Sequence, residues 1–344
     1  MIRLNLCVSR KKRIFSGNFA FDRVFWKIFR IDSCISLFFP LFFVFHFPFF
    51  ILPFPQTAVR GVFSMLKNSE SKINTVCRPS RCGISTACFY PEDTFSAFRR
   101  VVDAGAPVAE VFMNSVDELS PESLKRFCDY AKENGTEIVS LHPYTSAFES
   151  LLFFSEYKRR LSDGLSLYAR FFEGAAVLGA KYIVFHGEKN TPTFSRSLSS
   201  DDCLCEAYGR LIELAKSYDL VFTQENVNNH RSQSPEFLRR VQTLVPDLRF
   251  TFDLKQAFRA KQNFREVIAA MGEKIVHVHM NDFGEHECCL PFDGFADMNA
   301  VKEALEKVGF HGSYILEVYR SCFSDADELA LSLNKTRAFF CPEE

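Results

Sequence analysis

The sequence lacks the paired cysteine motifs of a zinc-binding or redox domain. Its twelve cysteines include no CxxC pair, which argues against a zinc knuckle and a thioredoxin-type site. Cys203 and Cys205 are separated by one residue, and Cys288 and Cys289 are adjacent. Thiols scattered in this way through 344 residues are typical of reduced cysteines in a cytosolic protein. We therefore expect a cytoplasmic location.

The main body of the chain also lacks an excess of positive charge. The formal net charge is -1, but it is unevenly distributed. Residues 1–64 hold nine Lys and Arg against Asp22 and Asp32, which gives +7 and leaves -8 for residues 65–344. Tight binding of nucleic acid depends on Lys and Arg that neutralise phosphates. An acidic body therefore argues against a nucleic-acid partner.

The N-terminal region has no clean targeting signal. Residues 35–55 form a Phe-rich apolar run about long enough to span a bilayer, but Pro40, Pro48 and Pro53 would break the hydrogen bonding of a helix. The run starts too late for a signal peptide, and no small-residue cleavage site follows it. We expect residues 1–64 to lie outside the working fold, with its start near Met65 and a linker over 65–81. The alternative is a membrane anchor through residues 35–55.

The main body alternates strand-like apolar runs with longer amphipathic ones, as in repeated βα units. Start signals such as Ser120-Pro121 and Ser234-Pro235, and stop signals such as Gly309, mark the helices between the strands. Eight strands are expected, at residues 82–88, 107–112, 137–142, 181–186, 220–224, 249–253, 275–280 and 313–317. Eight such units over about 260 residues predict an α/β fold, the (β/α)8 TIM barrel.

A doubly wound open sheet is the alternative fold. It would need a glycine-rich phosphate loop after its first strand. Residues 86–91 read Thr-Ala-Cys-Phe-Tyr-Pro and contain no glycine. We therefore favour the barrel, preceded by the hydrophobic extension.

Six of the predicted strands carry an imidazole or a carboxylate at their last residue or directly beside it. These residues are His142, His186, Glu225, Asp253, His279 and Glu317. Catalytic side chains of a TIM barrel lie at the C-terminal ends of its strands, so the six are expected at one face. Burying carboxylates together is costly unless their charge is compensated, and a divalent cation is the simplest compensation. The pattern predicts a metal site.

These strand ends resemble the xylose-isomerase-like TIM-barrel superfamily over approximately residues 82–340. That superfamily holds sugar-phosphate isomerases and epimerases, ketose 3-epimerases and endonuclease IV. The resemblance is carried by residues 83–86 (Gly-Ile-Ser-Thr), 142–144 (His-Pro-Tyr), His186-Gly187, Glu225-Asn226, Asp253, 279–282 (His-Met-Asn-Asp) and Leu316-Glu317.

The resemblance to the epimerase branch implies a ligand set and a mechanism. It implies that one divalent ion, Mn, Mg, Co or Zn, is held by four residues, Glu225, Asp253, His279 and Glu317. It also implies that Glu225 and Glu317 are the catalytic acid/base pair, on opposite faces of the reacting carbon. A metal ion acidifies the C–H next to a carbonyl, so one glutamate removes that proton and the other returns one.

Two departures separate the chain from endonuclease IV. Gln256 stands three residues after the metal aspartate, where the family often has a histidine, and glutamine is a poor zinc ligand. Gly284 stands where the endonuclease has the aspartate of an Asp-x-His motif, so only His286 matches. His142 and His186 correspond to ligands of another endonuclease zinc and could hold a second metal with Glu225. We instead expect substrate-binding roles for His142, His186, Gln256 and His286.

The expected protein is a metal-dependent sugar or sugar-phosphate isomerase or epimerase. Its expected partner is a small sugar or sugar phosphate, and a homo-oligomer stays open because no feature of the sequence encodes the oligomeric state. The alternatives are an endonuclease IV-like phosphodiesterase acting on abasic DNA and a non-catalytic sugar-binding barrel.

Several further residues near the strand ends have two interpretations. Glu110 lies inside the second strand, where core hydrogen bonding and substrate contact are equally expected. His277 precedes His279 by two residues and is expected beneath the metal rather than on it. Further expectations are that Asn281 and Asp282 orient His279, and that Lys189 and Arg231, although loop residues able to meet a phosphate, are only solvated.

Overall fold

The computed structural model describes residues 81–192, 196–285 and 287–342. The expected extension over residues 1–64, its candidate membrane segment 35–55, and His286 lie outside the described residues, as does the expected linker apart from Arg81. Among the helices that are described, none is long and apolar enough to cross a membrane. The described cysteines form no disulfide bond.

Eight parallel strands close into a barrel, which confirms the (β/α)8 prediction and excludes the open doubly wound sheet. The order around the barrel is β1-β10-β7-β6-β5-β4-β3-β2, so neighbours in space follow the chain. The strands are β1 (Cys82–Ser85), β2 (Val108–Met113), β3 (Glu137–Pro143), β4 (Tyr182–Phe185), β5 (Val221–Glu225), β6 (Arg249–Asp253), β7 (Ile275–Met280) and β10 (Ser313–Leu316).

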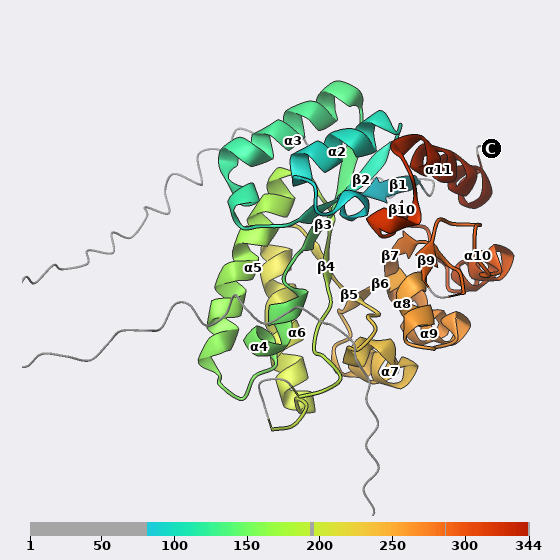
Figure 1. The fold of residues 1–344 in the computed structure, drawn as a ribbon. Coiled ribbons are helices and arrows are strands. Elements are labelled where there is room, and N and C mark those ends of the chain that lie inside the picture. Colours follow the sequence, from blue (N-terminus) through green and yellow to red (C-terminus); the bar gives the residue numbers. More distant parts are fainter. Residues whose placement is uncertain (1–80, 193–195, 286, 343–344) are drawn as a thin grey trace, which may run out of the picture. The chain divides into compact units, whose positions relative to one another are not determined.

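Helices surround the strands on the outside of the barrel (Figure 1). They are α2 (Thr94–Asp103), α3 (Pro121–Asn134), α4 (Ser146–Phe153), α5 (Arg159–Val177), α6 (Asp201–Ser217), α7 (Pro235–Leu244), α8 (Leu254–Arg259), α9 (Phe264–Met271), α10 (Met298–Lys307) and α11 (Ala326–Phe340). The short 3-10 helices are η1 (Thr86–Phe89), η2 (Asp117–Leu119), η3 (Arg231–Gln233), η4 (Gly272–Lys274) and η5 (Arg320–Cys322).

The predicted capping signals form the helix ends. The Ser120 hydroxyl accepts a hydrogen bond from the backbone N–H of Ser123, and Pro121 occupies the first turn of α3. Gly135 ends α3 in the left-handed conformation, with a φ of 70°. The Ser234 hydroxyl caps α7 in the same way.

The first strand is shorter than the sequence predicts. β1 ends at Ser85 rather than at residue 88, because the Ser85 hydroxyl accepts from the backbone N–H of Ala87 and turns the chain into η1. A second difference follows β7, where β8 (Asp282–Phe283) and β9 (Cys288–Cys289) pair as an antiparallel hairpin. Sequence periodicity cannot resolve strands of two residues.

The interior of the barrel contains buried polar side chains. Ser140 on β3 lies 3.2 Å from His277 on β7, and Glu110 on β2 lies 2.9 Å from the same imidazole. Neither strand neighbours β7, so these contacts cross the inside of the barrel. Fully buried polar side chains of this kind need hydrogen-bonding partners. The polar layer lies beneath the C-terminal ends of the strands.

Candidate functional site

Four side chains from the ends of neighbouring strands converge at one face of the barrel. The register of β6 and β7 places Asp253 beside His279, Glu225 ends β5, and Glu317 follows β10 directly. One ligand-type atom from each of the four residues lies within 4.8 Å of the others. The four residues that the sequence suggests as metal ligands are therefore brought together.

His279 lies at the centre of this group. Its Nδ1 atom is 3.3 Å from Glu317 Oε2, 3.8 Å from Asp253 Oδ2 and 4.0 Å from Glu225 Oε1. Asp253 and His279 are fully buried, and Glu317 is the most exposed of the four at 9%. Three carboxylates so close together in a buried site repel one another strongly unless a cation lies among them.

The four residues fit a divalent metal ion. Glu225 Oε2, Asp253 Oδ2 and His279 Nδ1 are buried atoms that make no hydrogen bond. Buried polar atoms without a hydrogen bond are rare in folded proteins, and the nearest polar neighbours of these three are other charged groups. Three carboxylates and one imidazole are a donor set that Mg, Mn, Co and Zn accept.

Asp253 is fixed by contacts to its other oxygen. Its Oδ1 atom caps α8 by accepting from the backbone N–H of Gln256 at 3.0 Å, and it accepts from Asn281 Nδ2 at 3.1 Å. The Asn226 side chain bonds the backbone N–H and C=O of Asp253, both at 2.8 Å. These contacts leave Oδ2 directed toward the cluster.

The expectation that Asn281 and Asp282 orient His279 is wrong. Asn281 instead holds Asp253, as described above. Asp282 accepts hydrogen bonds from the backbone N–H groups of Phe283, Gly294 and Ala296. Its carboxylate therefore holds the backbone of the hairpin and of the loop that follows it, and these three hydrogen bonds occupy it away from His279.

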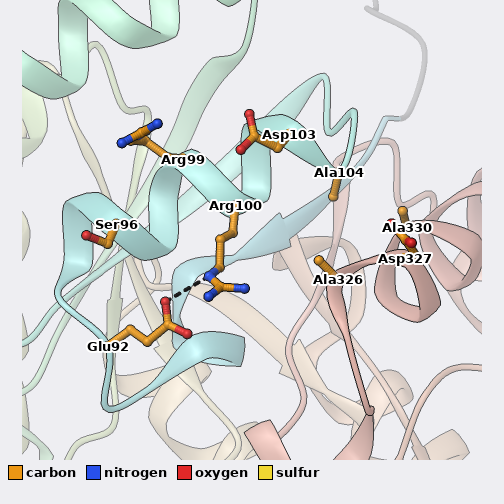
Figure 2. A pocket seen from close by; sticks show the side chains of 9 residues that line it. All are labelled: Glu92, Ser96, Arg99, Arg100, Asp103, Ala104, Ala326, Asp327 and Ala330. Atoms are coloured by element: carbon orange, nitrogen blue, oxygen red, sulfur yellow. Dashed lines mark ion pairs between the residues drawn. The ribbon is translucent and has the colours of Figure 1, made fainter.

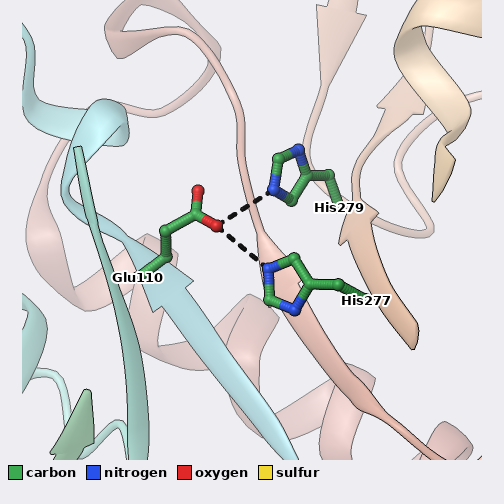
Figure 3. Close-up of side chains that lie close together, drawn as sticks. All are labelled: Glu110, His277 and His279. Atoms are coloured by element: carbon green, nitrogen blue, oxygen red, sulfur yellow. Dashed lines mark hydrogen bonds and ion pairs between the residues drawn. The ribbon is translucent and has the colours of Figure 1, made fainter. Parts of the chain in front are cut away.

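A buried glutamate holds His279 from the opposite side. Figure 3 shows the Glu110 carboxylate facing both His277 and His279, and its Oε2 atom is 2.9 Å and 3.2 Å from their Nε2 atoms. Burial favours a neutral carboxyl, but the His279 charge and the His277 hydrogen bond outweigh it, so the pKa of Glu110 lies well below its usual value. A carboxylate can only accept, so His279 Nε2 carries the hydrogen and Nδ1 faces the cluster.

Glu110 thus has the core role rather than contact with substrate. It is fully buried, and it also accepts from Ser140 at 2.8 Å and from Ser85 at 3.1 Å. His277 lies beneath His279 in the same network, as its position two residues earlier predicts.

His142 and His186 lie on the far side of Glu225. Their Nε2 atoms are 3.5 Å and 3.1 Å from Glu225 Oε2 and 3.0 Å from each other. The three residues form a second group that could hold a metal ion. Burial lowers the pKa of His186, but the charge of Glu225 outweighs this and raises it to about 9.

Three further residues from the sequence analysis, Gln256, Arg231 and Lys189, have different surroundings in the structure. The Gln256 side chain is engaged, because its Oε1 atom accepts from the backbone N–H of Asn228 at 3.2 Å. Arg231 differs from the expectation of a solvated loop residue: it is largely buried and pairs with Glu188 at 2.7 Å. Lys189 forms a backbone bridge with His230.

A comparison with protein families identifies the chain. The model of the family described as xylose isomerase-like TIM barrel matches residues 98–338. The chain belongs to the xylose isomerase-like TIM-barrel family. No curated protein matches its sequence.

Solved structures with this family's barrel include several sugar epimerases. A D-tagatose 3-epimerase-like protein is 20% identical, with a TM-score of 0.62 over 76% of this chain and 98% of the other. The 3-keto-D-glucoside 4-epimerase of E. coli is 19% identical, with a TM-score of 0.59 over 75% and 99%. The IolI protein, solved with a zinc atom, is 16% identical, with a TM-score of 0.63 over 76% and 98%. At these identities the similarity shows the fold.

One residue at this face of the barrel could not be predicted from the sequence. Lys255 is 4% exposed, and its Nζ atom lies 2.9 Å from Glu317 Oε2 and 3.3 Å from Asp253 Oδ2. Burial opposes its charge, but Asp253 and Glu317 raise the pKa of Lys255 well above its usual value. The sequence gives one indication of this role, which is that Lys255 stands two residues after the strand-end residue Asp253.

A separate cavity lies between α2 and α11, on the outer ring of helices (Figure 2). Its volume is about 460 Å³. Arg100 pairs there with Glu92 at 2.9 Å, so those charges compensate each other. None of the strand-end residues lines this cavity.

Proposed function

We propose that this protein is a metal-dependent sugar or sugar-phosphate isomerase or epimerase. The observation that carries the proposal is the convergence of Glu225, Asp253, His279 and Glu317 within 4.8 Å at the strand ends of a xylose isomerase-like barrel. Structural neighbours named as sugar epimerases support the same reaction class.

Glu225 and Glu317 are assigned as the acid/base pair. Burial would raise the pKa of each, but the pKa of Glu225 is lowered by His186 and the pKa of Glu317 by Lys255. Both are therefore ionised in the metal-free protein and able to accept a proton. A divalent ion bound to the four side chains would polarise the substrate carbonyl and acidify the neighbouring C–H.

The two glutamates divide the proton transfer between them. One removes the proton next to the carbonyl, and the other returns a proton to the opposite face, which inverts that carbon. A 1,2-isomerisation needs only one of them as the base. His142, His186 and Gln256 are assigned to the substrate, since they lie around Glu225 and Asp253 at the same end of the barrel.

Hydrogen exchange with solvent tests the reaction even when the product sugar is not identified. The full chain, supplied with divalent metal, is incubated in D2O with a panel of ketoses and ketose phosphates. We expect deuterium at the carbon next to the carbonyl, detected by NMR. Glu225→Gln and Glu317→Gln should each lower the exchange rate about 100-fold or more.

A surface variant provides the matched control. Glu303 is exposed on α10, so Glu303→Gln makes the same chemical change away from the strand ends and should exchange at the wild-type rate. Substantial metal-dependent exchange by Glu225→Gln would contradict the proposal. An absence of exchange with every sugar would favour the non-catalytic sugar-binding barrel.

The group of His142, His186 and Glu225 supports a second candidate, an endonuclease IV-like phosphodiesterase acting on abasic DNA. Against it stand Gln256 in place of a histidine ligand and the acidic charge of residues 65–344. Elemental analysis separates the two functions. Three zinc ions per chain, together with cleavage of abasic DNA, would replace the isomerase proposal, which expects one divalent ion.

A further inference from the structure

Lys255 contacts the same oxygen atoms that would bind a metal ion. Its Nζ atom donates to Glu317 Oε2 at 2.9 Å, and that oxygen is also the one 3.3 Å from His279 Nδ1. Nζ lies 3.3 Å from Asp253 Oδ2, which is likewise the oxygen nearest His279. The ammonium is therefore directed at the ligand atoms themselves.

The position of the ammonium is fixed by the surrounding structure. Lys255 is the second residue of α8, the helix that Asp253 caps. Its Nζ also donates to the backbone C=O of Glu317 at 3.3 Å and lies 5.2 Å from the centre of the Tyr319 ring. With only 4% of the residue exposed, water cannot replace these contacts.

We propose that Lys255 is a tethered counter-cation that competes with the divalent ion for Glu317 and Asp253. It holds the carboxylate cluster together in the metal-free protein and weakens the affinity of the site for metal. The proposal rests on the metal site of the proposed function and adds a regulator of its occupancy.

Charge and donor geometry both support this competition. A lysine ammonium has three donors and no acceptor, so each oxygen it binds gives up electron density that a metal would use. A metal held by the same oxygens would also lie within a few ångströms of the ammonium, where two cations repel strongly in a buried site. Metal binding must therefore displace Lys255 or overcome that repulsion.

The competition predicts tighter metal binding when the charge is removed. Lys255→Met keeps the length of the side chain and removes the ammonium. In titration calorimetry of chelator-treated full-length protein with Mn²⁺, we expect the affinity of this variant to rise about tenfold or more, by relief of the charge repulsion. The affinity of the variant for Zn²⁺ should also rise.

Thermal unfolding provides a second readout that does not depend on catalysis. Without metal, Lys255→Met should unfold at a lower temperature than wild type, because the carboxylates lose their counter-charge. With saturating Mn²⁺ the difference should shrink or reverse. Lys307→Met, which removes an exposed lysine on α10, is the matched control and should change neither quantity.

The outcomes distinguish this proposal from the metal site on which it rests. An affinity of Lys255→Met equal to or weaker than that of wild type would overturn the role of Lys255 and leave the metal site intact. If neither protein binds a divalent ion, the metal site itself is overturned, and this proposal with it. Lys255→Gln, which keeps a polar group, makes the same comparison if the methionine variant does not fold.

Discussion

The two ring nitrogens of His279 have different partners, and this difference defines the site. Nε2 donates to Glu110 beneath the strand ends, and Nδ1 faces Glu225, Asp253 and Glu317. A carboxylate that accepts from one nitrogen fixes the tautomer and increases the basicity of the other. Glu110 therefore determines which atom of His279 is offered to a metal ion.

Replacing Glu110 should weaken metal binding although this residue lies beneath the ligands. Glu110→Gln removes the negative charge, and its amide can present a donor to Nε2 instead of an acceptor. We expect the affinity for Mn²⁺ or Zn²⁺ to fall about 10- to 100-fold, as when other hydrogen-bonding partners of metal-bound histidines are changed. Titration calorimetry on chelator-treated protein measures the effect.

The control for Glu110→Gln is the exposed Glu303→Gln, for which no change is expected. An unchanged metal affinity in folded Glu110→Gln would show that His279 is oriented without the hydrogen bond to Glu110. A loss of folding would be visible as a lower unfolding temperature, so the two effects can be separated.

The raised pKa of His186 predicts how the stability of the metal-free protein depends on pH. Burial opposes its charge, but Glu225 raises its pKa from 6.5 to about 9. Because the folded-state pKa is raised, its stabilisation is fully present below about pH 6.5 and is lost as the pH rises toward 9. At about 1.4 kcal/mol per pKa unit, the loss is at most about 3 kcal/mol.

Urea denaturation of chelator-treated protein across this pH window measures the effect. His186→Gln removes the titrating group, so the stability of this variant should decline less between pH 6.5 and 9. Other groups titrate in the same range, such as Cys322 with a pKa lowered to about 7 by Cys288, and the comparison cancels their contribution. Parallel stability curves for the two proteins would rule out the assigned role of His186.

Sequence reasoning reaches the strand-end residues but not the contacts between them. Glu225, Asp253 and His279 can be predicted because a residue that ends a barrel strand has a known direction. Lys255 cannot, because its long side chain reaches the site from the first turn of α8, and its direction depends on tertiary contacts. The bond of Arg231 to Glu188 is hidden for the same reason, since the two lie in different loops.

At the level of single elements, β1 shows what a strand boundary depends on. Its end at Ser85 is set by one side-chain hydrogen bond, which apolar periodicity cannot reveal. Gly83 within the strand has a different explanation: a Cβ atom there would lie 2.0 Å from the backbone oxygen of Val108 on β2. The glycine of the sequence motif is therefore required by the close approach of two barrel strands.

The start of helix α8 explains how Asp253 is held in the carboxylate cluster. It starts directly after β6, so Asp253 is both the last strand residue and the helix cap. One carboxylate oxygen satisfies the helix, and the other is left for the cluster. The short connection gives Asp253 little conformational freedom, which suits a metal ligand.

At the scale of the whole molecule, the barrel could be predicted because eight strand-like runs alternate with helical ones. Two of the expected strands, 249–253 and 275–280, have the observed bounds. The β8–β9 hairpin could not be predicted, because strands of two residues carry no period. The polar interior is also hidden from the sequence, since partners such as Ser140 and His277 meet across the barrel.

The two ends of the described barrel meet through a pair of thiols. Cys82 begins β1 and Cys341 follows α11, and their sulfur atoms are 3.3 Å apart although 259 positions separate them in the sequence. The hydrogen bond between the two thiols lowers the pKa of Cys341 and raises that of Cys82. Cys341 is therefore the better nucleophile of the pair at neutral pH.

Oxidation should link these ends and stabilise the barrel. With glutathione disulfide, the Cys341 thiolate displaces one glutathione, and Cys82 then displaces the second, which leaves a disulfide and two reduced glutathiones. Closing so long a loop stabilises the fold by up to about 5 kcal/mol in the chain-entropy model. We expect a linked peptide pair by mass spectrometry and a higher unfolding temperature.

Three serine variants provide the controls for this oxidation. Cys82→Ser and Cys341→Ser should each abolish both effects, whereas Cys205→Ser, at an exposed position, should retain them. A linked protein that unfolds at the reduced protein's temperature would mean that the bond strains the ends it joins.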